Sequence, residues 1–184
     1  FYDRIKYYLE SPYDQTLYLD TDTHVVKNIS EIFNMFDRFD VLARIDPFRN
    51  TAGEHWGNDQ YEVDVPESFP EYQCGVLGFK DTKVVRELFQ DWRNRYGEYL
   101  QSDLIDQPFF REALFHSNIN LGTLPPEYNL LVNNLNCLQK EAKILHFNGG
   151  YADQSRLPWN GRSKDEVADL INSKHPLRRV VYPN

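Results

Sequence analysis

The sequence predicts an α/β protein built around a layered sheet. Short apolar segments rich in β-branched and aromatic residues alternate with segments whose apolar residues repeat at helical spacing, which is typical of an α/β fold. The 184 residues are enough for a sizeable core, and an apolar content of 41% predicts that the chain folds. We therefore expect residues 1–184 to form a single domain.

The periodicity predicts four strands and five helices. The expected strands are residues 17–19, 40–46, 74–79 and 143–147, and the expected helices are residues 2–10, 28–36, 81–92, 106–115 and 163–171. Asn28 or Ser30 is expected to cap the second helix, and Asp81 the third. Ser163 and Glu166 have the spacing of a capping box, which marks the start of the last helix.

The composition excludes several classes of protein. A formal net charge of −8 argues against a nucleic acid as the main partner. The sequence has no apolar run long enough to span a bilayer and no recognisable signal peptide. Cys74 and Cys137 lack a Cys-x-x-Cys spacing, so we expect reduced thiols in a cytoplasmic protein. The alternative location is the lumen of the secretory pathway, if a membrane anchor precedes Phe1.

Two carboxylates follow the first apolar strand directly. Asp20 and Asp22 come after Leu17–Leu19, a segment with the size and β-propensity of a buried strand. Residues two apart in extended backbone point the same way, so the two carboxylates are expected to converge. Like charges that close repel each other unless a cation lies between them, and oxygen ligands suit Mg²⁺ or Mn²⁺. The alternative is an Asp-rich turn without a ligand.

A histidine at the end of the last expected strand offers a third ligand. In open α/β sheets, ligands gather beyond the strand ends, and His146 lies at the end of segment 143–147. Two carboxylates and one imidazole make a three-ligand Mn²⁺ site with open positions for substrate oxygens. The alternative is a neutral polar histidine with no ligand role.

Together these motifs resemble a known family. The strand leading into Asp20-Thr21-Asp22 resembles the Asp-x-Asp motif of nucleotide-sugar-dependent glycosyltransferases with the A-type fold. The whole set is most similar to the retaining family-eight class and its nucleotide-diphospho-sugar transferase relatives. The other matching motifs are Ser11-Pro12-Tyr13, Arg44, Cys74-Gly75-Val76, Asp106-Gln107, Leu124-Pro125-Pro126-Glu127-Tyr128-Asn129, His146-Phe147-Asn148-Gly149 and Leu157-Pro158-Trp159. Their order and spacing are more specific than any single motif.

The resemblance implies a fold and an activity. The fold would be an A-type, Rossmann-like mixed sheet flanked by helices. Because the family places a nucleoside-binding βαβ half before its Asp-x-Asp strand, we expect residues 1–184 to be an N-terminally incomplete catalytic domain. The activity would be metal-dependent transfer of a sugar from a UDP- or GDP-sugar, with UDP favoured, to a carbohydrate, lipid or protein acceptor. The anomeric configuration would be retained.

The resemblance also implies roles for individual residues. The residues that would hold Mn²⁺ or Mg²⁺ are Asp20, Asp22 and His146. Asp106 and Gln107 would contact the transferred sugar, and Arg44 would be the cation near the leaving group. The residues implied in binding the donor are Asp20, Asp22, Gly75 and Gly149, and Gly75 would let the donor approach the backbone closely.

Three of these expectations have alternatives or departures. Arg44 is alternatively half of an ion pair with Asp40 or Asp46. Asp106 is alternatively the cap of its own helix. Leu157 stands in the Pro-Trp motif where the family usually has a lysine, so the phosphate-binding lysine is missing from its place.

Two other functions compete with sugar transfer. A non-catalytic sugar- or nucleotide-binding remnant would keep the fold without turnover. A metal-dependent phosphohydrolase would use the paired aspartates, but such two-metal sites generally need further clustered carboxylates and histidines. We therefore rank the phosphohydrolase last.

Overall fold

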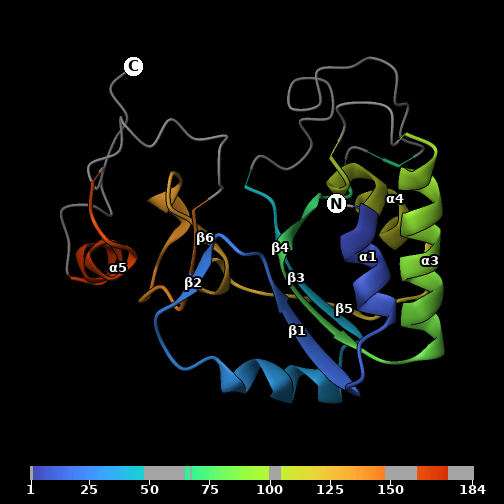
Figure 1. The fold of residues 1–184 in the computed structure, drawn as a ribbon, viewed down its shortest axis with the longest axis horizontal. Helices are drawn as coiled ribbons and strands as arrows, with labels where there is room; N and C mark the ends of the chain where they lie inside the picture. The colour runs from blue at the N-terminus through green and yellow to red at the C-terminus, as the bar shows by residue number, and fades with distance from the viewer. Residues whose placement is uncertain (1, 48–64, 67, 100–104, 148–160, 174–184) are drawn as a thin grey trace.

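Two sheets and the helices that cover them make up the described part of the protein (Figure 1). The computed structural model describes residues 2–47, 65–66, 68–99, 105–147 and 161–173. The larger sheet has the strand order β1-β4-β3-β5, and the smaller sheet has the order β2-β7-β6. None of the helices in these ranges combines the length and the apolar character needed to cross a bilayer.

The arrangement confirms the predicted mixed α/β fold. The strands are β1 (Gln15–Leu19), β2 (Thr23–Val25), β3 (Val41–Ile45), β4 (Tyr72–Lys80), β5 (Leu121–Thr123), β6 (Leu130–Leu131) and β7 (Ile144–His146). The α-helices are α1 (Tyr2–Leu9), α3 (Lys83–Gly97), α4 (Gln107–His116) and α5 (Lys164–Asn172), and the 3-10 helices are η1 (Ser30–Asp37), η2 (Pro126–Tyr128) and η3 (Leu135–Cys137). Strand β4 is antiparallel to β1 and β3, and β3 is parallel to β5. Strand β7 is antiparallel to β2 and parallel to β6.

Strand β4 is an inner strand of the larger sheet, and its sequence suits that place. Every residue from Tyr72 to Phe79 is buried, as a strand covered on both faces requires. One face packs against α1, α3 and α4, which lie together on one side of the sheet in Figure 1, and Phe89 and Trp92 fill this core. The opposite face packs against Ile32 and Phe36 of η1.

Helix α5 and the smaller sheet share a separate core. Val167, Ala168 and Ile171 of the helix are buried in the same apolar cluster as Leu130 and Leu145 of the sheet. The predicted capping box that starts this helix is confirmed, since both of its reciprocal hydrogen bonds are present. This core supports β7, the strand that ends in His146.

Strand β1 and two helix starts differ from the expectations. Strand β1 lies at the edge of the larger sheet and is half-buried, because only β4 pairs with it. Helix α3 is capped by Thr82, whose side chain accepts a hydrogen bond from the backbone of Val85, while Asp81 forms an ion pair with Arg86. Asp81 and Thr82 can both serve as helix caps. Because the side chain of Asp81 is engaged by Arg86, Thr82 is the residue that caps α3.

The second predicted helix is a 3-10 helix. Its N-cap is Ile29, which makes no side-chain capping bond. Asn28 instead accepts a hydrogen bond from the backbone N–H of Ser30, at 2.8 Å, within a local turn. Asn28 and Ser30, the two predicted caps, therefore do not cap this helix.

Candidate functional site

The link between β1 and β2 carries both aspartates of the Asp-x-Asp motif. Strand β1 ends at Leu19, and the backbone oxygen of Asp20 accepts hydrogen bonds from the backbone N–H and the hydroxyl of Thr23, at 3.0 and 2.7 Å. These bonds close a turn, which brings Asp20 and Asp22 to the junction of the two sheets. The two carboxylates converge as predicted, but through a turn rather than through extended backbone.

Strand β7 brings His146 to the same junction. It pairs antiparallel with β2, and His146 lies opposite Thr23 in the register. The backbone N–H of Phe147 donates to the backbone oxygen of Asp22 at 3.0 Å. This pairing places Nε2 of His146 at 3.2 Å from Oδ1 of Asp22.

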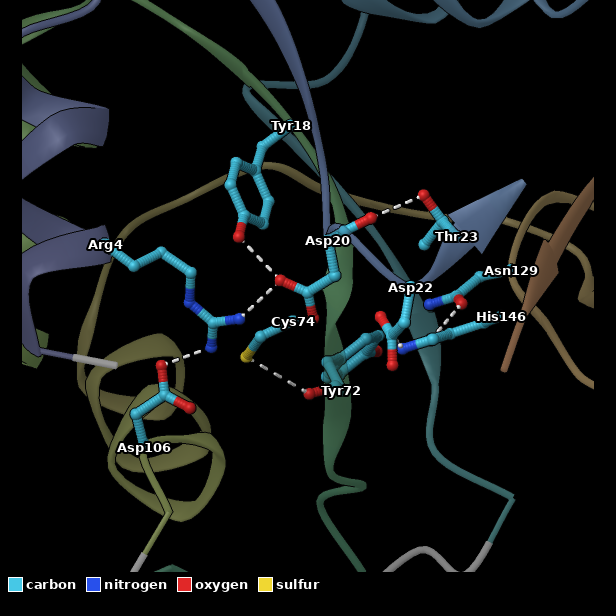
Figure 2. Close-up of polar contacts among 10 residues, drawn as sticks. All are labelled: Arg4, Tyr18, Asp20, Asp22, Thr23, Tyr72, Cys74, Asp106, Asn129 and His146. Atoms are coloured by element: carbon cyan, nitrogen blue, oxygen red, sulfur yellow. Dashed lines mark hydrogen bonds and ion pairs between the residues drawn. The ribbon is translucent and has the colours of Figure 1, made fainter. Parts of the chain in front are cut away.

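The three predicted metal ligands form one cluster (Figure 2). Asp20, Asp22 and His146 each offer a ligand atom, and the three atoms lie within 4.8 Å of one another. Among the described residues, this is a group of acidic and histidine side chains that could hold a metal ion. Two carboxylate oxygens and one imidazole nitrogen suit Mn²⁺, and in this set only the histidine is less suited to Mg²⁺.

Hydrogen bonding and burial fix the state of His146. Burial lowers the pKa of the imidazole, and the carboxylates of Asp22 and Asp20 oppose that effect without reversing it. Oδ1 of Asn129 lies 2.9 Å from Nδ1, and a cation on Nε2 would require the proton of the neutral ring to be on Nδ1, where this oxygen would accept it. The lone pair of Nε2 then faces the Asp22 carboxylate. Nε2 of His146 and Oδ1 of Asp22 would then both be acceptors at a short distance, an arrangement that favours a cation between them.

Gly75 of β4 lies directly beneath this cluster. A Cβ atom at this position would stand 2.2 Å from Cε1 of His146 and 3.1 Å from Oδ2 of Asp20. The backbone oxygen of Gly75 also accepts a hydrogen bond from the backbone N–H of Asp20, at 2.8 Å. The observed reason for a glycine here is therefore the space that the imidazole occupies.

Arg4 is a site residue that the sequence reasoning missed. Its guanidinium group bridges the carboxylates of Asp20 and Asp106, with 2.8 Å to Oδ1 of Asp20 (Figure 2). The hydroxyl of Tyr18 donates to the same Asp20 oxygen at 2.6 Å. Burial acts to lower the pKa of Arg4, but the carboxylates, Asp106 foremost, raise it overall, so the side chain stays charged. The periodicity of the first helix gives no signal for this role.

Asp106 is the N-cap residue of α4, but its side chain does not cap the helix. It makes no side-chain capping bond, and its buried carboxylate binds Arg4 instead. Its backbone oxygen accepts a hydrogen bond from Nε1 of Trp92 at 2.8 Å. Burial raises the pKa of the Asp106 carboxyl, and the charge of Arg4 opposes that rise. The capping alternative therefore holds for the backbone of Asp106, whose oxygen accepts from the backbone N–H of Phe110 at 3.2 Å, but not for its side chain.

Gln107 is the next residue and the first of α4. Its side-chain nitrogen donates to Asp46 at 3.1 Å and to Glu71 at 3.0 Å. The Asp-Gln pair thus stands at the start of a helix that packs against the larger sheet. It is joined to the three-ligand cluster through Arg4, which contacts both Asp106 and Asp20.

Arg44 lies behind the cluster rather than in it. The side chain is 3% exposed and donates to the backbone oxygen of Asn129 and, at 3.0 Å, to Sγ of Cys137. Burial lowers its pKa. Of the two alternative ion-pair partners, Asp40 pairs with Lys80 at 2.9 Å, whereas the charge of Asp46 acts on Arg44 and opposes the lowering of its pKa by burial. Within the described residues, Arg44 is connected to His146 through Asn129.

Part of the predicted donor site lies outside the described residues. This applies to Gly149 and to the motif at 157–159.

Comparisons with known proteins reveal the fold of the chain. No family model and no curated protein matches the sequence. The galactosyltransferase LgtC, solved with donor and acceptor sugar analogues, is 18% identical and has a TM-score of 0.61 over 95% of this chain and 68% of its own. The bifunctional glycosyltransferase WbbM is 16% identical, with a TM-score of 0.58 over 96% of this chain and 36% of its own.

A third neighbour comes from an animal. Mouse xyloside xylosyltransferase 1 is 18% identical, with a TM-score of 0.52 over 79% of this chain and 61% of its own. These likenesses and the mixed sheets define the class to which the fold belongs. The chain has the A-type fold of nucleotide-sugar glycosyltransferases.

Proposed function

We propose that the protein transfers a sugar from a nucleotide-diphosphate sugar, with a UDP-sugar favoured, to a carbohydrate, lipid or protein acceptor. We also propose that the anomeric configuration is retained, as the resemblance implies. The observation that carries the proposal is the convergence of Asp20, Asp22 and His146 at the junction of the two sheets. Asp106 binds the same arginine as Asp20, so the proposed sugar-binding pair adjoins this cluster.

The cluster fits a divalent cation. Cis ligands of an octahedral ion with bonds of about 2.1 Å lie about 3 Å apart. The 3.2 Å between Nε2 of His146 and Oδ1 of Asp22 matches that spacing. Asp20, Asp22 and His146 would therefore hold Mn²⁺ or Mg²⁺. When bound, the ion would act as a Lewis acid that stabilises the charge of the leaving diphosphate.

The protein's own side chains would orient the reactants. Arg4 fixes one oxygen of Asp20, so that this carboxylate is held in place before a ligand arrives. The same arginine stays charged between Asp20 and Asp106 and offsets part of their negative charge beside the proposed position of the transferred sugar. Gln107 contributes a side-chain amide next to Asp106. Gly75 leaves room for the imidazole on which the cluster depends.

The proposed role of Arg44 changes, and that of Gly149 stays as the resemblance implies. Arg44 would act on the site through Asn129, whose backbone oxygen it binds, rather than as a direct contact of the leaving group. Gly149 stays a proposed donor contact, since it follows His146 by three residues.

The test is donor turnover that depends on both the metal and the two aspartates. We expect UDP-sugar hydrolysis or transfer in the presence of Mn²⁺, loss of this activity with a chelator, and loss in an Asp20→Ala, Asp22→Ala double variant. Full activity of the double variant would contradict the proposal. Calorimetric titration with UDP and Mn²⁺ provides a second measurement. Binding of UDP without turnover of any sugar would favour the non-catalytic alternative.

A further inference from the structure

Two acidic side chains hold the amide of Gln107 from one side. Asp46 follows β3 and Glu71 precedes β4, and the backbone N–H of Asp46 donates to the backbone oxygen of Glu71 at 2.8 Å. Both side chains are buried, with 9% and 2% exposed. The amide nitrogen of Gln107 lies 3.1 Å from Oδ2 of Asp46 and 3.0 Å from Oε1 of Glu71. The three side chains thus form a cluster, which we call the amide clamp.

The chemistry of the amide clamp permits one orientation of the amide. A glutamine side chain has two N–H donors on its nitrogen and an oxygen that only accepts. The nitrogen faces two carboxyl groups, which gives each donor an acceptor. A flipped amide would place its oxygen against the Asp46 carboxylate and lose that hydrogen bond, even where a protonated Glu71 donates to the oxygen, and this loss is costly for buried polar groups. Asp46 and Glu71 therefore select the orientation.

The clamp leaves the amide oxygen of Gln107 available. Within the described residues, Oε1 of Gln107 accepts no hydrogen bond. Gln107 is half-buried, whereas Asp46, Glu71 and Asp106 are buried, so the glutamine is the exposed part of this region. An oriented, unoccupied acceptor beside Asp106 suits a hydroxyl group or the anomeric carbon of a sugar.

We propose that Glu71 and Asp46 are positioning residues that hold the Gln107 amide with its oxygen turned toward the sugar that is being transferred. This inference rests on the proposed function for the identity of the ligand. The orientation of the amide itself rests only on the contacts of the clamp. Burial raises the pKa of Glu71, which agrees with a carboxyl group that has little water around it, and a protonated carboxyl still accepts through its carbonyl oxygen.

The first test compares two variants at one position in the full chain. Glu71→Met removes the acceptor but keeps the length of the side chain, and Glu71→Gln keeps an acceptor oxygen. With UDP-glucose or UDP-galactose and Mn²⁺, we expect Glu71→Met to lower kcat for donor hydrolysis by about tenfold to a hundredfold, because small misplacements of a reacting group have effects of that size. The KM for the donor should stay within about threefold, and Glu71→Gln should restore most of kcat.

A stability measurement separates positioning from simple structural damage. Glu71→Met removes a desolvated carboxyl group but also one of the two acceptors of the Gln107 amide, so its unfolding free energy should fall by no more than about 1–3 kcal/mol and the protein should stay folded. The matched control is Glu112→Met. Glu112 is also a buried glutamate, but it belongs to α4 and pairs with Arg95 of α3. We expect the control to leave kcat unchanged. If Glu71→Met does not fold, Asp46→Leu and Asp46→Asn form an equivalent pair.

A second test does not require turnover. The side-chain amide signals of Gln107, assigned by their absence in Gln107→Glu, should exchange with solvent more slowly than those of the exposed Gln90. Glu71→Met should abolish this protection, and Glu71→Gln should keep it. Equal exchange at Gln107 and Gln90 in the wild type, or an unchanged kcat in Glu71→Met, would overturn the inference. An inactive wild type with a protected Gln107 amide would refute the proposed function and leave the clamp standing.

Discussion

The side-chain oxygen of Asn129 lies 2.9 Å from Nδ1 of His146, on the side of the ring away from Nε2, which lies 3.2 Å from Oδ1 of Asp22. Asn129 is fully buried, and its backbone oxygen is held by Arg44. Partners behind a metal-binding histidine generally fix its tautomer and its orientation. Arg44, Asn129 and His146 therefore form a supporting chain that ends at the candidate metal ligands.

The first prediction concerns this chain. Asn129→Leu removes the acceptor for the Nδ1 proton and should weaken Mn²⁺ binding by about tenfold to a hundredfold, the usual effect of losing such a partner. Asn129→Asp keeps an acceptor oxygen at the same place and should bind Mn²⁺ nearly as well as the wild type. Isothermal titration with Mn²⁺ alone measures both. Equal affinity of Asn129→Leu and the wild type would show that the contact does not support the ligand.

The second prediction concerns the space beneath the imidazole. Gly75→Ala places a methyl group 2.2 Å from Cε1 and 2.8 Å from Nδ1 of His146, so the ring must move and the cluster must open. We expect Mn²⁺ binding and turnover to fall by at least about tenfold, while the protein stays folded. Circular dichroism and the same titration check the two parts of this expectation.

Gly97→Ala is the matched control for the glycine substitution. Its methyl group would meet the ring of Tyr2 at 3.4 Å, which the ring can accommodate. Since Gly97 is the last residue of α3, alanine should stabilise the protein by up to about 1 kcal/mol without changing Mn²⁺ binding. A loss of Mn²⁺ affinity in Gly97→Ala as large as that in Gly75→Ala would mean that the effect is not local.

The pieces of the fold that could be predicted are those with long, regular patterns. The apolar run at β4 and the helical spacing of α3 were recognised because each spans at least two repeats. Strands β2, β5 and β6 have three, three and two residues, too few for any periodicity, and none was predicted, whereas the equally short β7 was recognised from its run of apolar residues. Their pairing depends on partners far away in the chain, which the local sequence does not encode.

The same distinction applies to the site. Asp20, Asp22 and His146 could be predicted because a motif marks the first two and a strand end marks the third. Arg4 had no local marker, since its role depends on contacts with residues 16 and 102 positions away. The extended backbone expected between the two aspartates was also wrong, because the Thr23 hydroxyl and backbone N–H close a turn there.

The third prediction concerns Arg4 and stability. Arg4→Met leaves the buried carboxylate of Asp106 without its positive partner, and breaking a buried pair in this way costs about 3–5 kcal/mol. Because burial already raises the pKa of Asp106, the variant can take up a proton there, so its loss of stability should shrink as the pH falls. Urea unfolding at several pH values measures this. Arg86→Met, which removes an exposed pair with Asp81, should have only a small effect.

The last prediction concerns Glu71 and the pH dependence of stability. Burial raises the pKa of this carboxyl group to about 7 from an ordinary value of 4.5, with Asp46 adding to the rise and the Gln107 hydrogen bond and Arg111 opposing it. The folded state therefore holds the proton more tightly than the unfolded chain does. The stability that this supplies is fully present below the unfolded pKa and is lost as the pH rises through the folded pKa.

Glu71→Gln removes this titration and should flatten the profile. Between pH 5.5 and 8, the wild type should lose about 2 kcal/mol more unfolding free energy than the variant, from the linkage of 1.36 kcal/mol per pKa unit. Urea unfolding at both pH values gives the two differences, and other titrating groups cancel in the comparison. A wild type and variant with parallel profiles would mean that Glu71 titrates normally. That result would leave the clamp geometry intact, since a carboxylate accepts the Gln107 hydrogen bond equally well.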